Sequence, residues 1–360
     1  MIKGKTILQY KRWFRGFLVC FLALLSLVAL FNCLVDGSGL FRLNKGLKYA
    51  ATNLLGGKMV AGPLGGYDER KLQRLIVEHY PRTRDMIVVG SSRTMRLQKR
   101  FIHGDLDFFN HSMAGADLED YVAILGLYRD KGSLPKTVVF SIDPWIFNKN
   151  KGLPQYWKSI SRYYEKMVAE VYGREIKVSM AGPNKYMQLI NLDYTRANYK
   201  YLRSGRKLYV TDRTDIDDFV REPDGSMLFP YKMRFKKDER STPYSPEATP
   251  IRHPNNFESL SRVKLFENFM LYLQKKEVNV ILLLLPLHPV AYKLFNDNPR
   301  YQLVLSLEKY LRDFGLRNHI MLIGSYDPGR YQLTGKDFFD DHHGHEIVAE
   351  KVFAEYFPSH

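Results

Sequence analysis

Met86-Ile87-Val88-Val89-Gly90-Ser91-Ser92 is a short apolar run that ends abruptly in a glycine and two serines. An apolar run without polar alternation is typical of a strand that is buried on both faces in a parallel sheet. Four more runs of this kind follow along the chain, at residues 106–109, 137–142, 278–285 and 319–323. The sequence therefore predicts five buried strands.

Segments with the apolar spacing of helices lie between or beside these runs. They cover residues 68–79, 118–128, 260–275, 301–314 and 346–356. Strands that alternate with helices form right-handed βαβ units and build a parallel sheet with helices on its faces. The expected fold class is α/β, a three-layer α/β/α arrangement around a parallel five-stranded sheet, as in flavodoxin-like folds.

A long apolar segment precedes this pattern. Residues 16–35 contain no charged side chain, and 20 helical residues reach about 30 Å, the thickness of the hydrocarbon core of a membrane. Five basic and no acidic residues come before it, which predicts a cytoplasmic N-terminus and a body on the other side of the membrane. A cleaved signal peptide is the alternative, but no Ala-x-Ala-like site follows the run.

Residues 148–256 interrupt the strand and helix alternation with an aromatic and basic segment, which we interpret as an insertion. Within it we expect a helical stretch at residues 155–172, a turn at Pro223-Asp224-Gly225 and a Pro-rich loop at residues 242–254. The predicted organisation is a cytoplasmic tail (1–15), a transmembrane helix (16–35), a connector (36–67) and one domain (68–360) with an insertion at about 148–256.

Charge and cysteine content limit the function. The net charge is +16, and the tail carries five of these charges, which leaves +11 for the rest of the chain and favours anionic surroundings such as lipid head groups or acidic polymers. A nucleic-acid partner is not expected, because no recognition motif is present. Both cysteines, Cys20 and Cys33, lie in the apolar run or beside it, so the body has none for a disulfide or a metal.

Three segments carry residues that could take part in catalysis or binding. Gly90-Ser91-Ser92-Arg93 follows the first strand, Asn110-His111-Ser112-Met113-Ala114-Gly115 follows the second, and Asp340-Asp341-His342-His343 precedes the last helix. The carboxyl ends of parallel strands meet at one edge of the sheet, where the active sites of such folds lie. A serine becomes a nucleophile when a histidine takes its proton and a carboxylate orients that histidine.

These three segments, with Gly-Ser-Ser, Asn-x-Ser-x-x-Gly and Asp-x-x-His in this order, resemble the SGNH (GDSL-like) hydrolase superfamily. The chain is most similar to membrane-anchored members that serve O-acylation of the cell envelope, as in teichoic-acid D-alanylation and alginate acetylation. The resemblance covers residues 85–143 and 277–356. It implies that Ser92 is the nucleophile, His343 the base, Asp340 the orienting acid, and the N–H groups of Ser92 and Gly115 the oxyanion-hole donors.

Asp143 departs from this family pattern, which has an asparagine amide after the third strand. A carboxylate would repel a developing oxyanion, so Asp143 must be protonated, turned away or used for another purpose. Asn110 or Asn148 could replace the amide. We further expect Arg93, Asn110, Asp143 and His288 near the substrate, although a surface ion pair for Arg93 and a capped loop for His288 are alternatives.

The resulting hypothesis is an extracytoplasmic serine O-acyl transferase or esterase that acts on an envelope polysaccharide or glycolipid, needs no cofactor or metal, and has a possible membrane O-acyltransferase as partner. The alternative is a non-catalytic envelope protein with the same scaffold. His342, His343 and His345 with Asp340 and Asp341 could instead bind a divalent metal. Asp340 or Asp341 could also simply cap the last helix. The sequence does not decide whether His342 or His343 faces the serine.

Overall fold

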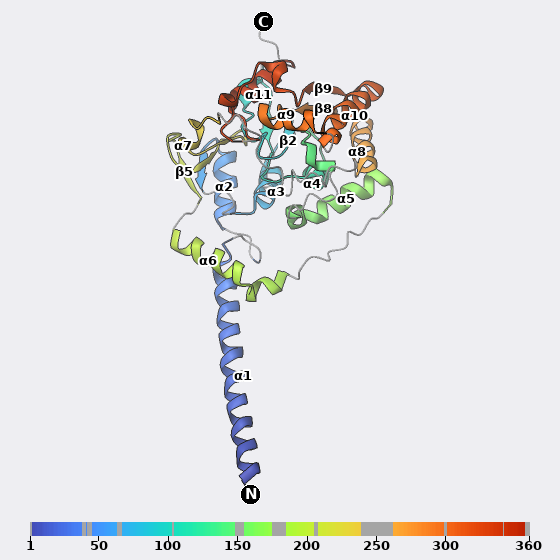
Figure 1. The fold of residues 1–360 in the computed structure, drawn as a ribbon. Helices are drawn as coiled ribbons and strands as arrows, with labels where there is room; N and C mark the ends of the chain where they lie inside the picture. The colour runs from blue at the N-terminus through green and yellow to red at the C-terminus, as the bar shows by residue number, and fades with distance from the viewer. Residues whose placement is uncertain are drawn as a thin grey trace.

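A computed structural model describes residues 2–37, 41, 45–62, 67–102, 104–147, 155–174, 185–204, 208–238, 262–298, 301–340 and 342–356. The first helix, α1 (Ile2–Val35), projects from a body that contains both sheets (Figure 1). An 18-residue stretch within its segment Gln9–Val35 has a mean hydropathy of 2.7. Among the described residues, this is the one helix that is long and apolar enough to cross a membrane.

The five predicted strands form one parallel sheet in the order β3-β2-β4-β8-β9, which confirms the α/β class. Their bounds are β2 (Met86–Val89), β3 (Phe108–Asn110), β4 (Thr137–Ser141), β8 (Asn279–Leu284) and β9 (Met321–Gly324). Alternate residues of β2 enter separate hydrophobic clusters, Ile87 and Val89 one and Met86 and Val88 the other. Both faces of β2 are therefore buried, as its unbroken apolar run predicts.

The helices that alternate with these strands supply the rest of the two clusters. They are α3 (Glu69–His79), α4 (Leu118–Asp130), α8 (Val263–Lys275), α9 (Pro289–Asp297), α10 (Gln302–Asn318) and α11 (Glu346–Phe353). All but α11 pack into the larger cluster, and α11 packs into the smaller one. Short 3-10 helices connect several elements: η1 (Lys99–Phe101), η2 (Pro144–Phe147), η9 (Pro328–Tyr331) and η10 (Gly335–Asp337).

A second sheet joins the predicted connector to the predicted insertion. Residues 45–62 of the connector form α2 (Lys45–Leu55) and β1 (Met59–Gly62), and the small residues of α2 pack in the main core. Strand β1 pairs antiparallel with insertion strands on both sides, in the order β5-β1-β6-β7. The partners are β5 (Tyr209–Thr211), β6 (Phe219–Arg221) and β7 (Met227–Leu228).

The other regular elements of the described insertion are helices. The stretch expected at residues 155–172 forms η3 (Tyr156–Ile160) and α5 (Ser161–Tyr172), which pack on α4. Further along, η4 (Lys185–Ile190) and α6 (Leu192–Ser204) cross the body end of α1, and α7 (Tyr231–Arg234) follows the second sheet (Figure 1). The turn at residues 223–225 is confirmed. Asn148, the loop at residues 242–254 and Asp341 lie outside the described residues.

Candidate active site

Ser92 lies in a tight turn directly after β2. The turn starts at Gly90, where only glycine fits. A Cβ there would lie 2.6 Å from Thr94 Oγ1 and 2.9 Å from Ser141 Cβ, which leaves no room for a side chain. The chain then folds back, with the Thr94 N–H donating to the Ser91 carbonyl oxygen at 3.1 Å. Ser91 is buried, whereas Ser92 stays partly exposed at the edge of the main sheet.

Ser92 contacts a histidine from the last loop of the domain. The distance from Ser92 Oγ to His343 Nε2 is 2.8 Å, and the distance from His343 Nδ1 to Asp340 Oδ2 is also 2.8 Å. The three side chains therefore form a continuous hydrogen-bonded series across 251 residues of sequence. This order of hydroxyl, imidazole and carboxylate is the one that serine activation requires.

The histidine loop is held from several sides. Asp340 Oδ1 accepts the backbone N–H groups of His342 at 3.0 Å and His343 at 2.7 Å. The His343 ring stacks on Phe339, with centroids 5.5 Å apart and planes at 6°, and meets Phe229 edge-on. These contacts fix the plane of the imidazole, and of the two candidate histidines it is His343 that meets Ser92.

The environment favours a neutral imidazole beside an ionised carboxylate. Burial lowers the pKa of His343 from its usual 6.5 and outweighs the hydrogen bond to Asp340, which acts to raise it. For Asp340, burial acts to raise the pKa, but the hydrogen bond and charge of His343 prevail and lower it well below 3.8. Near neutral pH, His343 is therefore free to accept a proton.

The two backbone N–H groups expected as oxyanion-hole donors are those of Ser92 and Gly115. Neither Ser92 N–H nor Gly115 N–H has a hydrogen-bond partner among the described residues. The segment that ends at Gly115 runs beside the Ser92 turn, because Met113 N–H donates to the Gly90 carbonyl oxygen at 3.0 Å. Gly115 adopts φ +57°, a left-handed conformation that suits glycine.

Asp143 forms an ion pair with Arg93. Arg93 Nη1 lies 2.7 Å from Asp143 Oδ1, and the two side chains are 2% and 0% exposed. Both side chains are thus enclosed by protein in this structure, and their contact with substrate stays a prediction. Of the options for Asp143 (protonated, turned away or used for another purpose), the structure supports the last, since its carboxylate is the counter-ion of Arg93.

Arg93 also binds the loops around the site. Its Nε donates to the His342 carbonyl oxygen at 3.0 Å, and its Nη2 donates to the carbonyl oxygens of Leu285 at 2.9 Å and Pro286 at 2.6 Å. One guanidinium thus links the serine turn, the end of β8 and the histidine loop. Sequence reasoning missed this role, although a buried carboxylate at a strand end requires a cation and Arg93 follows the serine directly.

Asn110 and His288 are enclosed by protein as well, and their contact with substrate also stays a prediction. The Asn110 amide donates to the carbonyl oxygens of Thr94 and Leu97, both at 2.9 Å, and is not available as an oxyanion donor. His288 Nδ1 accepts the Val290 N–H at 3.2 Å and caps α9. The capped-loop alternative is thus confirmed for His288, which is 0% exposed.

The last loop also contains a candidate set of metal ligands. One ligand atom each of Asp340, His342 and His343 lies within 4.8 Å of the others. Both ring nitrogens of His343 already make hydrogen bonds, so a metal at this residue would displace Ser92 or Asp340. His345 is not part of this set, since its Nε2 lies 2.9 Å from the Lys236 carbonyl oxygen.

Comparison with known proteins adds no family. No family model matches the chain, and no curated protein matches it either. The case for a function therefore rests on the geometry of the site and on the three sequence segments that form it.

Proposed function

We propose that this chain is a membrane-anchored serine esterase or O-acyl transferase with an SGNH-like domain, and that its substrate is an acylated polymer or glycolipid of the cell envelope. The observation that carries the proposal is the hydrogen-bonded series Ser92–His343–Asp340. We also propose the three-layer α/β/α arrangement of that superfamily, which the burial of both faces of β2 supports.

The proposed reaction starts with attack of Ser92 Oγ on an acyl carbonyl carbon, while His343 Nε2 takes the hydroxyl proton. Asp340 stabilises the imidazolium that forms. The unpaired N–H groups of Ser92 and Gly115 stabilise the oxyanion. Proton return from His343 releases the alcohol and leaves an acyl-Ser92 ester, which a sugar hydroxyl or water then cleaves to give the transferase or the esterase outcome.

The proposed location follows from α1 and its flanking charges. Lys3, Lys5, Lys11, Arg12 and Arg15 keep the N-terminus cytoplasmic, so the body lies on the opposite side of the membrane. The +11 charge of the remainder suits an anionic envelope surface. A membrane O-acyltransferase is a suitable partner, because it would supply acyl groups on this side.

Two alternatives have an observation in their favour. The buried Arg93–Asp143 pair stands where the family has an amide donor, which favours a non-catalytic scaffold that positions polymer. The close ligand atoms of Asp340, His342 and His343 favour metal-dependent hydrolysis.

A serine-directed fluorophosphonate separates the serine enzyme from the other two functions, and elemental analysis for bound zinc or manganese separates those two. We expect the purified full chain to be labelled, and Ser92→Ala to reduce the labelling rate by roughly 10³-fold or more. Ser91→Ala is the matched control, because Ser91 is the adjacent buried hydroxyl without contact to His343, and it should retain labelling. Absence of labelling in the parent chain contradicts the serine enzyme; bound zinc or manganese then favours the metal site, and no bound metal favours the scaffold.

A further inference from the structure

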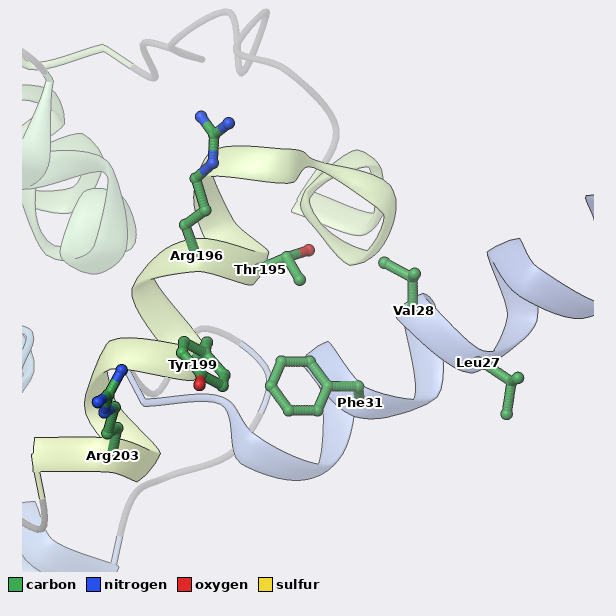
Figure 2. A pocket seen from close by; sticks show the side chains of 7 residues that line it. All are labelled: Leu27, Val28, Phe31, Thr195, Arg196, Tyr199 and Arg203. Atoms are coloured by element: carbon green, nitrogen blue, oxygen red, sulfur yellow. The ribbon is translucent and has the colours of Figure 1, made fainter.

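A large groove lies between the membrane helix and the helix that crosses it, away from the serine site. Its volume is about 660 Å³. Both helices line it: Leu27, Val28 and Phe31 from α1, and Arg196, Tyr199 and Arg203 from α6. Figure 2 shows the Phe31 ring facing the Tyr199 ring, with both arginines on α6.

A buried polar joint fixes α6 to α1 and so preserves the groove. Asn32 lies in the apolar part of α1 and is 0% exposed. Its Nδ2 donates to the Leu189 carbonyl oxygen at 2.8 Å and to Thr195 Oγ1 at 2.7 Å, and its Oδ1 accepts from Asn198 Nδ2 at 3.0 Å. A polar side chain within an apolar span needs such partners, and among the described residues they come from η4 and α6.

The segment from η4 to α6 is unusually apolar on its surface. Its exposed large hydrophobic side chains are Tyr186, Met187, Ile190, Leu192, Tyr199 and Leu202. A concentration of exposed apolar side chains on one element is typical of a binding or membrane surface. Because the segment crosses the body end of the apolar helix (Figure 1), its nearest apolar medium is the membrane that α1 spans.

The groove lies near the body end of the apolar helix α1. Phe31 and Leu27 precede the end of α1 at Val35 by about 6 and 12 Å, at ~1.5 Å per residue. The α1 wall of the groove is apolar, and α6 places Arg196, Tyr199 and Arg203 on one helical face. No acidic side chain of the described residues lines the groove, and Asp193, 3.3 Å from Arg196, is an exposed partner that competes weakly.

We propose that this groove binds an anionic glycerophospholipid of the outer leaflet. Its phosphate meets the arginines of α6, and an acyl chain lies along Leu27, Val28 and Phe31. The bound lipid holds α6 in the membrane surface and thereby fixes the height of the body above the bilayer. The proposal needs α1 to span a membrane but does not depend on catalysis by Ser92.

Lipid retention by the full chain in detergent tests this proposal by native mass spectrometry. Phosphatidylglycerol and phosphatidylcholine with identical acyl chains are added in equal amounts. We expect preferential retention of phosphatidylglycerol, and a reduction of that preference by about tenfold in Arg196→Gln/Arg203→Gln, since each basic side chain at a membrane surface contributes attraction for anionic lipid. Lys309→Gln/Arg317→Gln removes the same charge from exposed positions of α10 and should keep the preference.

Two further variants make the result specific. Tyr199→Ala, at a side chain that is 57% exposed, should weaken retention of both lipids without unfolding the protein. Ser92→Ala should retain the parent's preference, so failure of the catalytic proposal and failure of this one are distinguishable. Equal retention of the two lipids by the parent chain, or an unchanged preference in the double arginine variant, would overturn the proposal.

Discussion

His343 uses both ring nitrogens, one toward Ser92 and one toward Asp340, whereas the adjacent His342 ring lies beside it with centroids 4.1 Å apart. The two residues therefore differ in position and not in chemistry. We expect His343→Ala to slow fluorophosphonate labelling by roughly 10²–10⁴-fold, because general-base assistance has about that value. His342→Ala, the matched control, should stay within a few-fold of the parent. Equal losses in both variants would contradict the assignment of the base.

The pH dependence of labelling follows from the pKa of the same imidazole. Burial lowers this pKa below 6.5, so His343 stays neutral to a lower pH than a free histidine. We expect the labelling rate to be constant near pH 7 and to fall with decreasing pH, with a midpoint below 6.5. In Asp340→Asn the residual activity should show a still lower midpoint, because the carboxylate acts to raise the pKa of His343. A midpoint above that of free histidine would show that burial does not control the site.

The sequence predicts which residues lie near the site better than it predicts where their side chains point. Ser92, Asp340 and His343 were predictable because each lies in a loop with a recognisable sequence motif, and the three meet in space. Arg93, Asn110 and His288 follow strands in the same way, yet their side chains point into protein. The difference depends on packing by segments far away in sequence, such as the Pro286 carbonyl that receives Arg93.

Helices α4 and α5 approach each other closely, which joins part of the insertion to the main core. A Cβ at Gly126 of α4 would lie 2.2 Å from the Tyr163 carbonyl oxygen of α5. We expect Gly126→Ala to lower the free energy of unfolding by about 1–3 kcal/mol, since the backbone must move to admit a methyl group. Urea unfolding of the full chain in detergent measures this change.

Gly16→Ala is the control for that measurement, because a Cβ at Gly16 in α1 would meet no atom within 4 Å. Equal stability of Gly126→Ala and Gly16→Ala would mean that α5 does not pack on α4 as described.

The elements of the main sheet were predictable because each buried strand has an unbroken apolar run. The second sheet was not, since its strands are two to four residues long and its strand β1 pairs with β5 and β6 across about 150–160 residues of sequence, as Met59 does with Thr211. Such short strands carry no periodicity. Helix α2 was missed for a related reason: its alanines, which look like connector residues, allow close packing against the core.

For the whole molecule, the proposed function requires the body and its serine to lie on the side of the membrane opposite the N-terminus. Helix α1 is long and apolar enough for the span, and the proposed direction rests on the five basic residues before it. The polar joint at Asn32 attaches η4 and α6 of the body to the apolar helix α1.

One measurement tests the serine and its location together. Spheroplasts that express the full chain are treated with a membrane-impermeant fluorophosphonate, and the adduct is located by peptide mass spectrometry. We predict an adduct on Ser92 in intact spheroplasts at the level found after lysis. An adduct that forms only after lysis would contradict the orientation, and the absence of any adduct on Ser92 in either sample would contradict the nucleophile.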